Sequence, residues 1–318
     1  MKKQLFWAYM AIGAICLIWG TTYLALRVAV ETSPPFFFSA VRQSIAGVLL
    51  FSYLVFIKKV ELPKGRYWGQ QALAGFLMIS LGNGLVAWGE MYVSSGLAAL
   101  ICSLMPVWVV VINVSISSSE RLNWQILVGI LIGMLGIFMV FSENLSEFAQ
   151  PAYRWGILFT FLAAISWAGG SILSKKIAGG NGPFMNASVQ MIFGSIGLYI
   201  MSPLSGEQAS FAFTSEALYA LVYLIVFGSI IAMSCYAYAL SKLPVSLVSL
   251  YAYVNPLVAI LLGAWVLNET LTGQTFAAIG VTLAGIYITN FGHRKNARNE
   301  EKVKLVTVLV GKHEESHK

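Results

Sequence analysis

The chain alternates long apolar runs with short polar junctions, and this alternation predicts its elements. A bilayer core about 30 Å thick is crossed by a helix of roughly 20 apolar residues, the length of each run. Helices also satisfy their own backbone hydrogen bonds in lipid, and no strand-like alternation is present. We therefore expect an all-α integral membrane protein with ten transmembrane helices, at 7–29, 36–57, 71–91, 94–115, 124–142, 155–175, 184–204, 217–240, 245–267 and 272–291.

Composition supports this class. Of the 318 residues, 58% are hydrophobic and 10% are charged, which is more apolar surface than a soluble domain of this size could bury. The lipid bilayer is therefore an expected partner. The basic start resembles a signal peptide, but the apolar run continues to Ala29 without a clear cleavage site, so we interpret it as the first spanning helix.

The distribution of cations predicts the orientation. If the N-terminus is cytoplasmic, ten of the cations before the tail lie inside and three lie outside. Seven more cations follow Gly292, in the tail. This bias agrees with the positive-inside rule, so both termini are predicted to be cytoplasmic, in a cell (plasma or inner) membrane. The net charge of +7 then reflects topology, and no nucleic-acid partner is expected because no soluble face gathers the charges. The inner cations are Lys2, Lys3, Lys58, Lys59, Lys64, Arg66, Arg121, Lys175, Lys176 and Lys242, and the outer ones are Arg27, Arg42 and Arg154.

The two halves of the chain repeat one another. Several residues recur 148 positions apart: Trp19 and Trp167, Arg27 and Lys175, Pro35 and Pro183, Phe36 and Phe184, and Val41 and Val189. We expect one five-helix repeat at 1–149, a second at 150–292 and a polar cytoplasmic tail at 293–318. Because five is odd, the second repeat starts on the opposite side of the membrane and is inverted, an arrangement typical of secondary transporters.

Three motifs recur in both halves. The second helix starts with a proline, the fourth run carries a central proline followed by a glutamate turn, and the last run is spaced with glycine. In this duplicated form the chain resembles the EamA-type branch of the drug/metabolite transporter (DMT) superfamily, over about residues 7–291. The resemblance implies a ten-helix carrier that moves small metabolites, often amino acids or their relatives. The direction of transport in this family is often outward. The residues are Pro35 through Arg42, Pro106 with Glu120, and Pro256 with Glu269.

Matched polar and aromatic residues near the membrane centre are the candidates for solute binding. Trp19 and Trp167 fall near the middle of their helices, although tryptophan usually gathers at membrane interfaces. Thr22 and Tyr23 follow Trp19 on one helical face, and Ser171 follows Trp167 in the same way. These side chains either line a cavity or pack helices together, with the hydroxyls bonded to the preceding turn.

The two prolines mark a second candidate region. Pro106 and Pro256 each free a backbone carbonyl, and a broken helix in lipid is tolerated where it lines a cavity. Ser103 lies just before Pro106, and Tyr251 and Asn255 lie one turn apart beside Pro256. We expect kinks at both prolines and solute contacts from these neighbours; kinks that only shape packing are the alternative.

Few polar groups occur inside the remaining runs. Asn83 stands between two glycines in the third run and either lines the cavity or links two helices. Arg42 lies about two turns inside the second helix, where it snorkels toward the interface, pairs with Glu90 or attracts an anionic group of the solute. The chain has no aspartate, and no proton-carrying carboxylate is evident at mid-membrane. Gly129 and Gly133 form a GxxxG pair that favours close helix packing.

The apolar runs carry no known catalytic signature. No nucleotide-binding lysine loop, GxSxG or SxxK motif occurs, and the one HExxH pattern, at 313–317, falls in the polar tail, so we expect no enzyme activity, no cofactor and no metal. We expect a secondary transporter that exports neutral or zwitterionic metabolites, most simply amino acids, by alternating access. A multidrug carrier of amphipathic compounds is the alternative, and a membrane scaffold is a third reading. The sequence leaves the solute, the coupling ion and the oligomeric state open.

Overall fold

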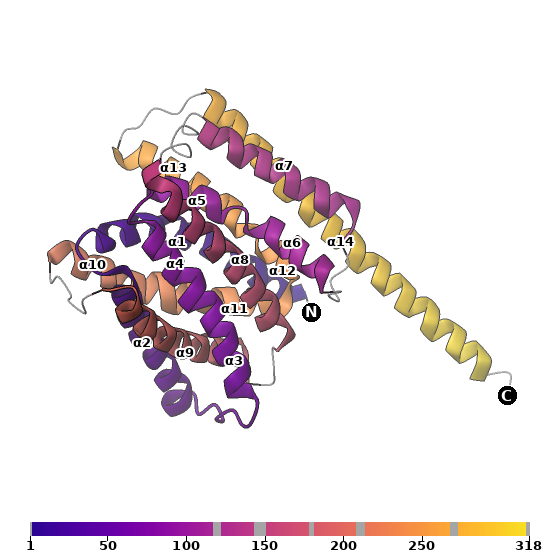
Figure 1. The fold of residues 1–318 in the computed structure, drawn as a ribbon. Helices are drawn as coiled ribbons and strands as arrows, with labels where there is room; N and C mark the ends of the chain where they lie inside the picture. Colours follow the sequence, from indigo (N-terminus) through magenta and orange to yellow (C-terminus); the bar gives the residue numbers. More distant parts are fainter. Residues whose placement is uncertain are drawn as a thin grey trace.

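The computed structural model describes residues 2–116, 122–142, 151–177, 181–207, 214–267 and 273–315, and these residues form a helical bundle (Figure 1). The first half of the chain contains α1 (Lys2–Val30), α2 (Pro35–Ser52), α3 (Tyr67–Gly75), α4 (Gly84–Gly89), α5 (Ser95–Cys102), α6 (Met105–Ser115) and α7 (Trp124–Phe141). The second contains α8 (Arg154–Lys176), α9 (Pro183–Leu204), α10 (Ser215–Tyr223), α11 (Ala232–Lys242), α12 (Val245–Val248), α13 (Tyr251–Leu267) and α14 (Gly273–Glu315). Glu120, Arg121 and Glu269 lie outside the described residues.

Within the described part of the chain, 8 helices are long and apolar enough to cross a membrane. They coincide with eight of the ten predicted runs. The fifth and ninth runs appear as shorter apolar helices, at Trp124–Met139 and Val245–Val258. The all-helical class is therefore confirmed, whereas the number of crossings and the cytoplasmic termini stay predictions.

The 148-residue repeat is visible in the backbone itself. The third helix of the first half contains a π-helical segment, η2, at Phe76–Asn83, and the third helix of the second half contains η5 at Leu224–Ile231. The two segments are equal in length and are separated by the same offset as Trp19 and Trp167. A π-helical segment widens the helix locally and occurs often at functional sites. Neither segment was predicted from the apolar pattern.

Equivalent helices of the two halves pack against each other. The second helices, α2 and α9, form one such pair, and the fifth helices, α7 and α14, form another (Figure 1). The first helix of each half packs instead against the third and fourth helices of the other half: α1 against α11 and α13, and α8 against α4 and α6. The two halves are therefore interleaved, and a space between them is bounded by both.

The α7–α14 pair depends on small residues. A Cβ atom on Gly285 would lie 2.2 Å from the backbone nitrogen of Gly133, and one on Gly129 would lie 2.5 Å from that of Thr289. Real Cβ atoms do not approach this closely, so only glycine permits this helix separation. The predicted role of Gly129 and Gly133 in close packing is confirmed, and their partner is α14.

Both fourth helices are broken, but the breaks differ in their relation to proline. In the first half α5 ends at Cys102, and Pro106 occupies the first turn of α6, where its missing N–H costs nothing. In the second half the break falls at Ser249 and Leu250, and Pro256 lies inside the continuous helix α13. The kink expected at Pro256 is therefore displaced to an earlier turn, which is tightened by a hydrogen bond from Leu250 N to Leu247 O (3.3 Å).

The last helix is longer than its apolar run. The sequence predicts a spanning helix at 272–291 followed by a separate polar tail at 293–318. In the structure α14 continues without interruption from Gly273 to Glu315 and extends beyond the bundle (Figure 1). The backbone remains helical because no glycine or proline follows directly after Gly292 to end it.

Candidate functional site

A cavity lies between the two interleaved halves, with a volume of about 90 Å³. Helix α1 and the fourth-helix breaks contribute to its wall, and so do both π-helical segments. Since one water needs roughly 10–15 Å³ of such volume, the cavity has room for about six to nine heavy atoms. It is lined by Trp19, Thr22, Tyr23, Leu26, Arg42, Gly82, Asn83, Val86, Cys102, Met105, Ala163, Ala164, Trp167, Gly228, Tyr251 and Asn255.

Two tryptophans from equivalent positions of the two halves form the aromatic wall. The rings of Trp19 and Trp167 meet edge to face, with centroids 5.5 Å apart and planes at 85°. Tyr251 adds a third ring, 4.9 Å from Trp19. Edge-to-face pairs are favourable because the positive ring edge meets the negative ring face. The wall therefore keeps its shape and offers aromatic faces to a bound molecule.

The indole N–H groups of both tryptophans are held by hydrogen bonds within the protein. Trp19 Nε1 donates to Gly228 O in η5 (3.0 Å), and Trp167 Nε1 donates to the Tyr236 hydroxyl (3.3 Å). Trp167 also lies against η2, since a Cβ atom on Gly82 would be 2.8 Å from its ring. Each first-helix tryptophan thus contacts the π-helical segment of the opposite half.

One wall of the cavity carries a positive charge. Arg42 is 4% exposed, and its Nη2 donates to Asn83 Oδ1 (2.8 Å). Its Nε has no hydrogen-bond partner within the described residues. Asn83 therefore both lines the cavity and links α2 to η2, so the two roles considered for it coexist.

Asn255 also combines two roles. With its amide nitrogen turned toward the neighbouring carbonyls, it donates to Tyr251 O (3.0 Å) and to Cys16 O (3.3 Å). The second bond joins α13 to α1 across the boundary between the halves. The amide oxygen is then left as an acceptor at the cavity wall, where Asn255 is 2% exposed.

Two predicted site residues lie outside the lining. The Ser103 hydroxyl donates to Leu100 O (2.5 Å), inside the turn that closes α5. The Ser171 hydroxyl contacts the Tyr236 hydroxyl at 2.6 Å and donates to Trp167 O at 2.6 Å. Ser171 thus supports the aromatic wall from behind. The seven other predicted residues, Trp19, Thr22, Tyr23, Asn83, Trp167, Tyr251 and Asn255, line the cavity.

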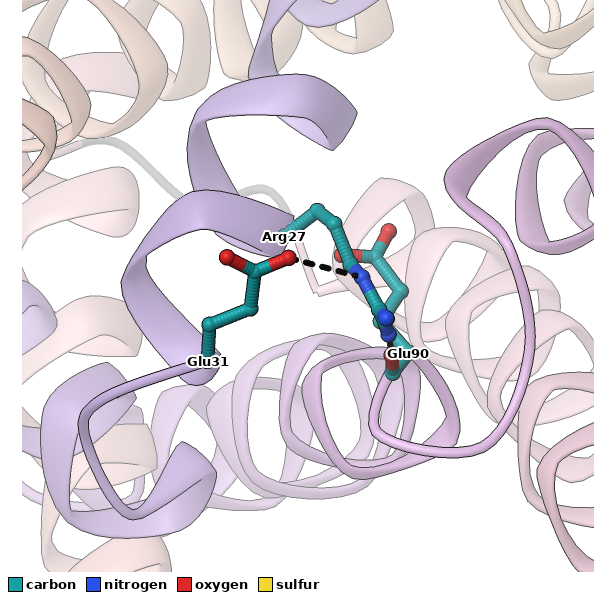
Figure 2. A network of polar contacts seen from close by, with 3 residues as sticks. All are labelled: Arg27, Glu31 and Glu90. Carbon is teal, nitrogen blue, oxygen red and sulfur yellow. Dashed lines mark hydrogen bonds and ion pairs between the residues drawn. The ribbon is translucent and has the colours of Figure 1, made fainter.

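The predicted pairing of Arg42 with Glu90 takes a different form. Glu90 is 0% exposed, and neither of its carboxylate oxygens has a hydrogen-bond partner within the described residues. Arg27 donates instead to the backbone carbonyl of Glu90, and its Nε lies 3.6 Å from a carboxylate oxygen of Glu31 (Figure 2). Arg42 and Glu90 attract each other only over a longer distance, and the hydrogen bond from Arg42 Nη2 goes to Asn83 instead.

Sequence reasoning missed Tyr236, which lies at the centre of the aromatic cluster. Its ring centroid is 5.3 Å from Trp19 and 5.7 Å from both Trp167 and Tyr251. The repeat offset of 148 pairs Tyr236 with Trp88, another aromatic residue. That match was the signal that could have identified it.

Comparisons with known proteins agree on one family. The profile of the EamA-like transporter family matches residues 6–142 and 154–291, one match in each half of the chain. The "Uncharacterized inner membrane transporter YedA" of Escherichia coli (strain K12) is 34% identical over 293 residues, covering 91% of this chain and 92% of the relative. An "Uncharacterized transporter" of Archaeoglobus fulgidus is 28% identical, covering 91% and 98%. One solved crystal structure has the same fold, with a TM-score of 0.74 at 20% identity, covering 91% of this chain and 98% of the other.

Proposed function

This chain belongs to the EamA-like transporter family and is a multi-pass plasma-membrane protein, and from that premise we propose that it exports small neutral or zwitterionic metabolites, most simply amino acids or their relatives. It does so by alternating access, in which the two repeats rock about the central cavity and expose it to one side at a time. The chain performs no catalysis and requires no cofactor.

The observation that carries the proposal is the contact of Trp19 with Trp167 at the cavity wall. Equivalent residues of two repeats meet at one small site, so any movement of one repeat against the other changes the site directly. Thr22, Asn83 and Asn255 also place polar groups around this space, and each makes a hydrogen bond within the protein as well. A cavity with these groups supports a partly polar solute and disfavours the scaffold reading.

The charge of the lining favours metabolites over cationic drugs. Among the described residues that line the cavity, Arg42 is the one with a charge, and none is acidic. An amphipathic cation would meet a like charge in a low-dielectric site, where repulsion is strong. A neutral or zwitterionic solute avoids that cost. The available volume also suits a small amino acid better than a large drug.

The proposed topology has ten crossings, inverted repeats and two cytoplasmic termini. The interleaved packing of α1 and α8 supports two repeats related by symmetry. Single cysteines at Lys59 and Lys242 should both react with an impermeant maleimide in inside-out vesicles and stay unreacted in intact cells. Labelling of the two positions from opposite sides would refute the inverted arrangement.

Transport itself is tested in vesicles. The purified protein, reconstituted into liposomes loaded with one unlabelled amino acid, should accumulate the same labelled amino acid by counterflow. A parallel series with amphipathic cations tests the multidrug alternative. Counterflow with cations and with no amino acid would replace the proposed solute class, and binding of a protein partner without any flux would favour the scaffold.

A further inference from the structure

Arg42 differs sharply from the residue at the equivalent position of the second repeat. Gln190 stands there, and its amide nitrogen donates both to Gln71 Oε1 (2.7 Å) and to Ser174 Oγ (2.9 Å). Gln190 is thereby engaged in a buried amide network and does not line the cavity. Arg42 lines it and, within the described residues, makes one hydrogen bond with the five N–H donors of its guanidinium.

Within the described residues, no carboxylate forms a direct ion pair with Arg42. A buried guanidinium normally forms a direct pair with a carboxylate, because an unpaired charge in a low-dielectric interior is costly. Glu90 does not supply that contact, because neither of its carboxylate oxygens has a hydrogen-bond partner within the described residues. Arg27 is occupied by Glu31 and the Glu90 carbonyl. The positive charge at the cavity wall thus lacks a bound anion from the protein.

The geometry points to Arg42 as the receptor for a carboxylate group of the transported solute. We propose that the unpartnered side of its guanidinium, including Nε, binds this carboxylate, while Asn83 holds the other side through Nη2. Guanidinium matches carboxylate as a two-pronged donor, and such charge-assisted bonds are roughly twice as strong as neutral ones. The inference rests on the proposed transport function and narrows its solute class to small carboxylates.

The rest of the cavity fits the remainder of such a solute. The aromatic wall of Trp19, Trp167 and Tyr251 accepts apolar groups, and its ring faces attract an ammonium group. The Asn255 oxygen is a further acceptor for an N–H donor. An amino acid with its carboxylate on Arg42 would therefore find partners for both of its charges.

Matched acids and amides provide the test, because each pair differs in charge and little in shape. Binding of L-alanine, L-serine, L-threonine and propionate, and of their amides, is measured to the protein in lipid nanodiscs. The wild-type protein should bind at least one acid about 10-fold or more tightly than its amide. Arg42→Gln should abolish this preference. Arg42→Lys keeps the charge but loses the two-pronged donor geometry of guanidinium, so it should retain part of the preference.

Two controls separate this role from a purely structural one. Glu90→Gln should keep the preference for acids, because Glu90 does not form the binding contact. If Arg42 served only to compensate Glu90, Glu90→Gln and Arg42→Gln would weaken acids and amides alike, which would overturn the inference. Arg154 carries an exposed guanidinium outside the cavity, so Arg154→Gln should bind the acids and amides as the wild-type protein does.

The result is distinguishable from failure of the proposed function. Equal binding of acids and amides, or binding of neither, overturns the carboxylate receptor. Counterflow of a solute without a carboxylate would then still support the proposed transport function. A clear acid preference without counterflow of any solute would support the receptor and remove the proposed transport cycle.

Discussion

Trp19 and Trp167 touch edge to face at 5.5 Å although 148 residues separate them in the chain. Their contact joins the two repeats at the cavity wall, and each indole N–H is anchored to a different neighbour. A change in the angle between the repeats must therefore alter this contact.

Trp167→Ala should reduce counterflow at least about 10-fold while the protein still inserts into the membrane. Removing the indole leaves Trp19 without its edge-to-face partner and enlarges the cavity, so a small solute is no longer held in one orientation. Initial flux in liposomes and the amount of folded protein after size-exclusion chromatography are the two readouts. Trp155→Ala is the control, because this side chain is 60% exposed. Wild-type flux in Trp167→Ala would exclude it from the site.

Asn255→Ala should also abolish most of the flux, because it removes both a cavity acceptor and the hydrogen bond between α13 and α1. Asn255→Ala loses two hydrogen bonds, at a cost of about 2 kcal/mol of stability, so folded protein should still be recovered. Asn290→Ala serves as the comparison, since it removes a bond between the helices carrying Asn290 and Tyr9 (3.1 Å) outside the cavity lining. Similar fluxes in the two variants would show that Asn255 has only a packing role.

Gly285→Ala should destabilise the protein by about 1–3 kcal/mol or more, because its Cβ atom would collide with the backbone of Gly133. Gly280→Ala on the same helix should be neutral or stabilise by up to about 1 kcal/mol, since nothing lies within 4 Å of its Cβ position. Thermal unfolding in detergent measures both. A lower midpoint for Gly280→Ala than for Gly285→Ala would contradict the close α7–α14 contact.

Much of the fold was predictable because lipid imposes a strong rule on sequence. Each spanning helix needs a long apolar run, and short polar junctions separate these runs clearly. The π-helical segments and the break at Ser249 were not predictable in this way. These features alter the backbone hydrogen bonding locally, inside runs that are predominantly apolar. The apolar pattern is therefore the same with or without them.

The candidate site was predictable where the repeat supplied a second copy. Trp19 with Trp167 stood out because both halves carry the same residue at the same offset. Ser103 and Ser171 lie outside the lining for a physical reason: a hydroxyl in a helix can turn to the preceding carbonyl as easily as to a cavity. Both do so here, with bonds to Leu100 O and Trp167 O.

The most direct test of the transport cycle uses a cysteine that already lines the cavity. Cys102 does so, whereas Cys16 and Cys235 do not, and both can be replaced by alanine. In this single-cysteine protein, alternating access predicts that impermeant thiol reagents modify Cys102 in right-side-out and in inside-out vesicles. A transported solute should slow both reactions. Modification from one side only, unchanged by any solute, would contradict a cavity that opens alternately to the two faces of the membrane.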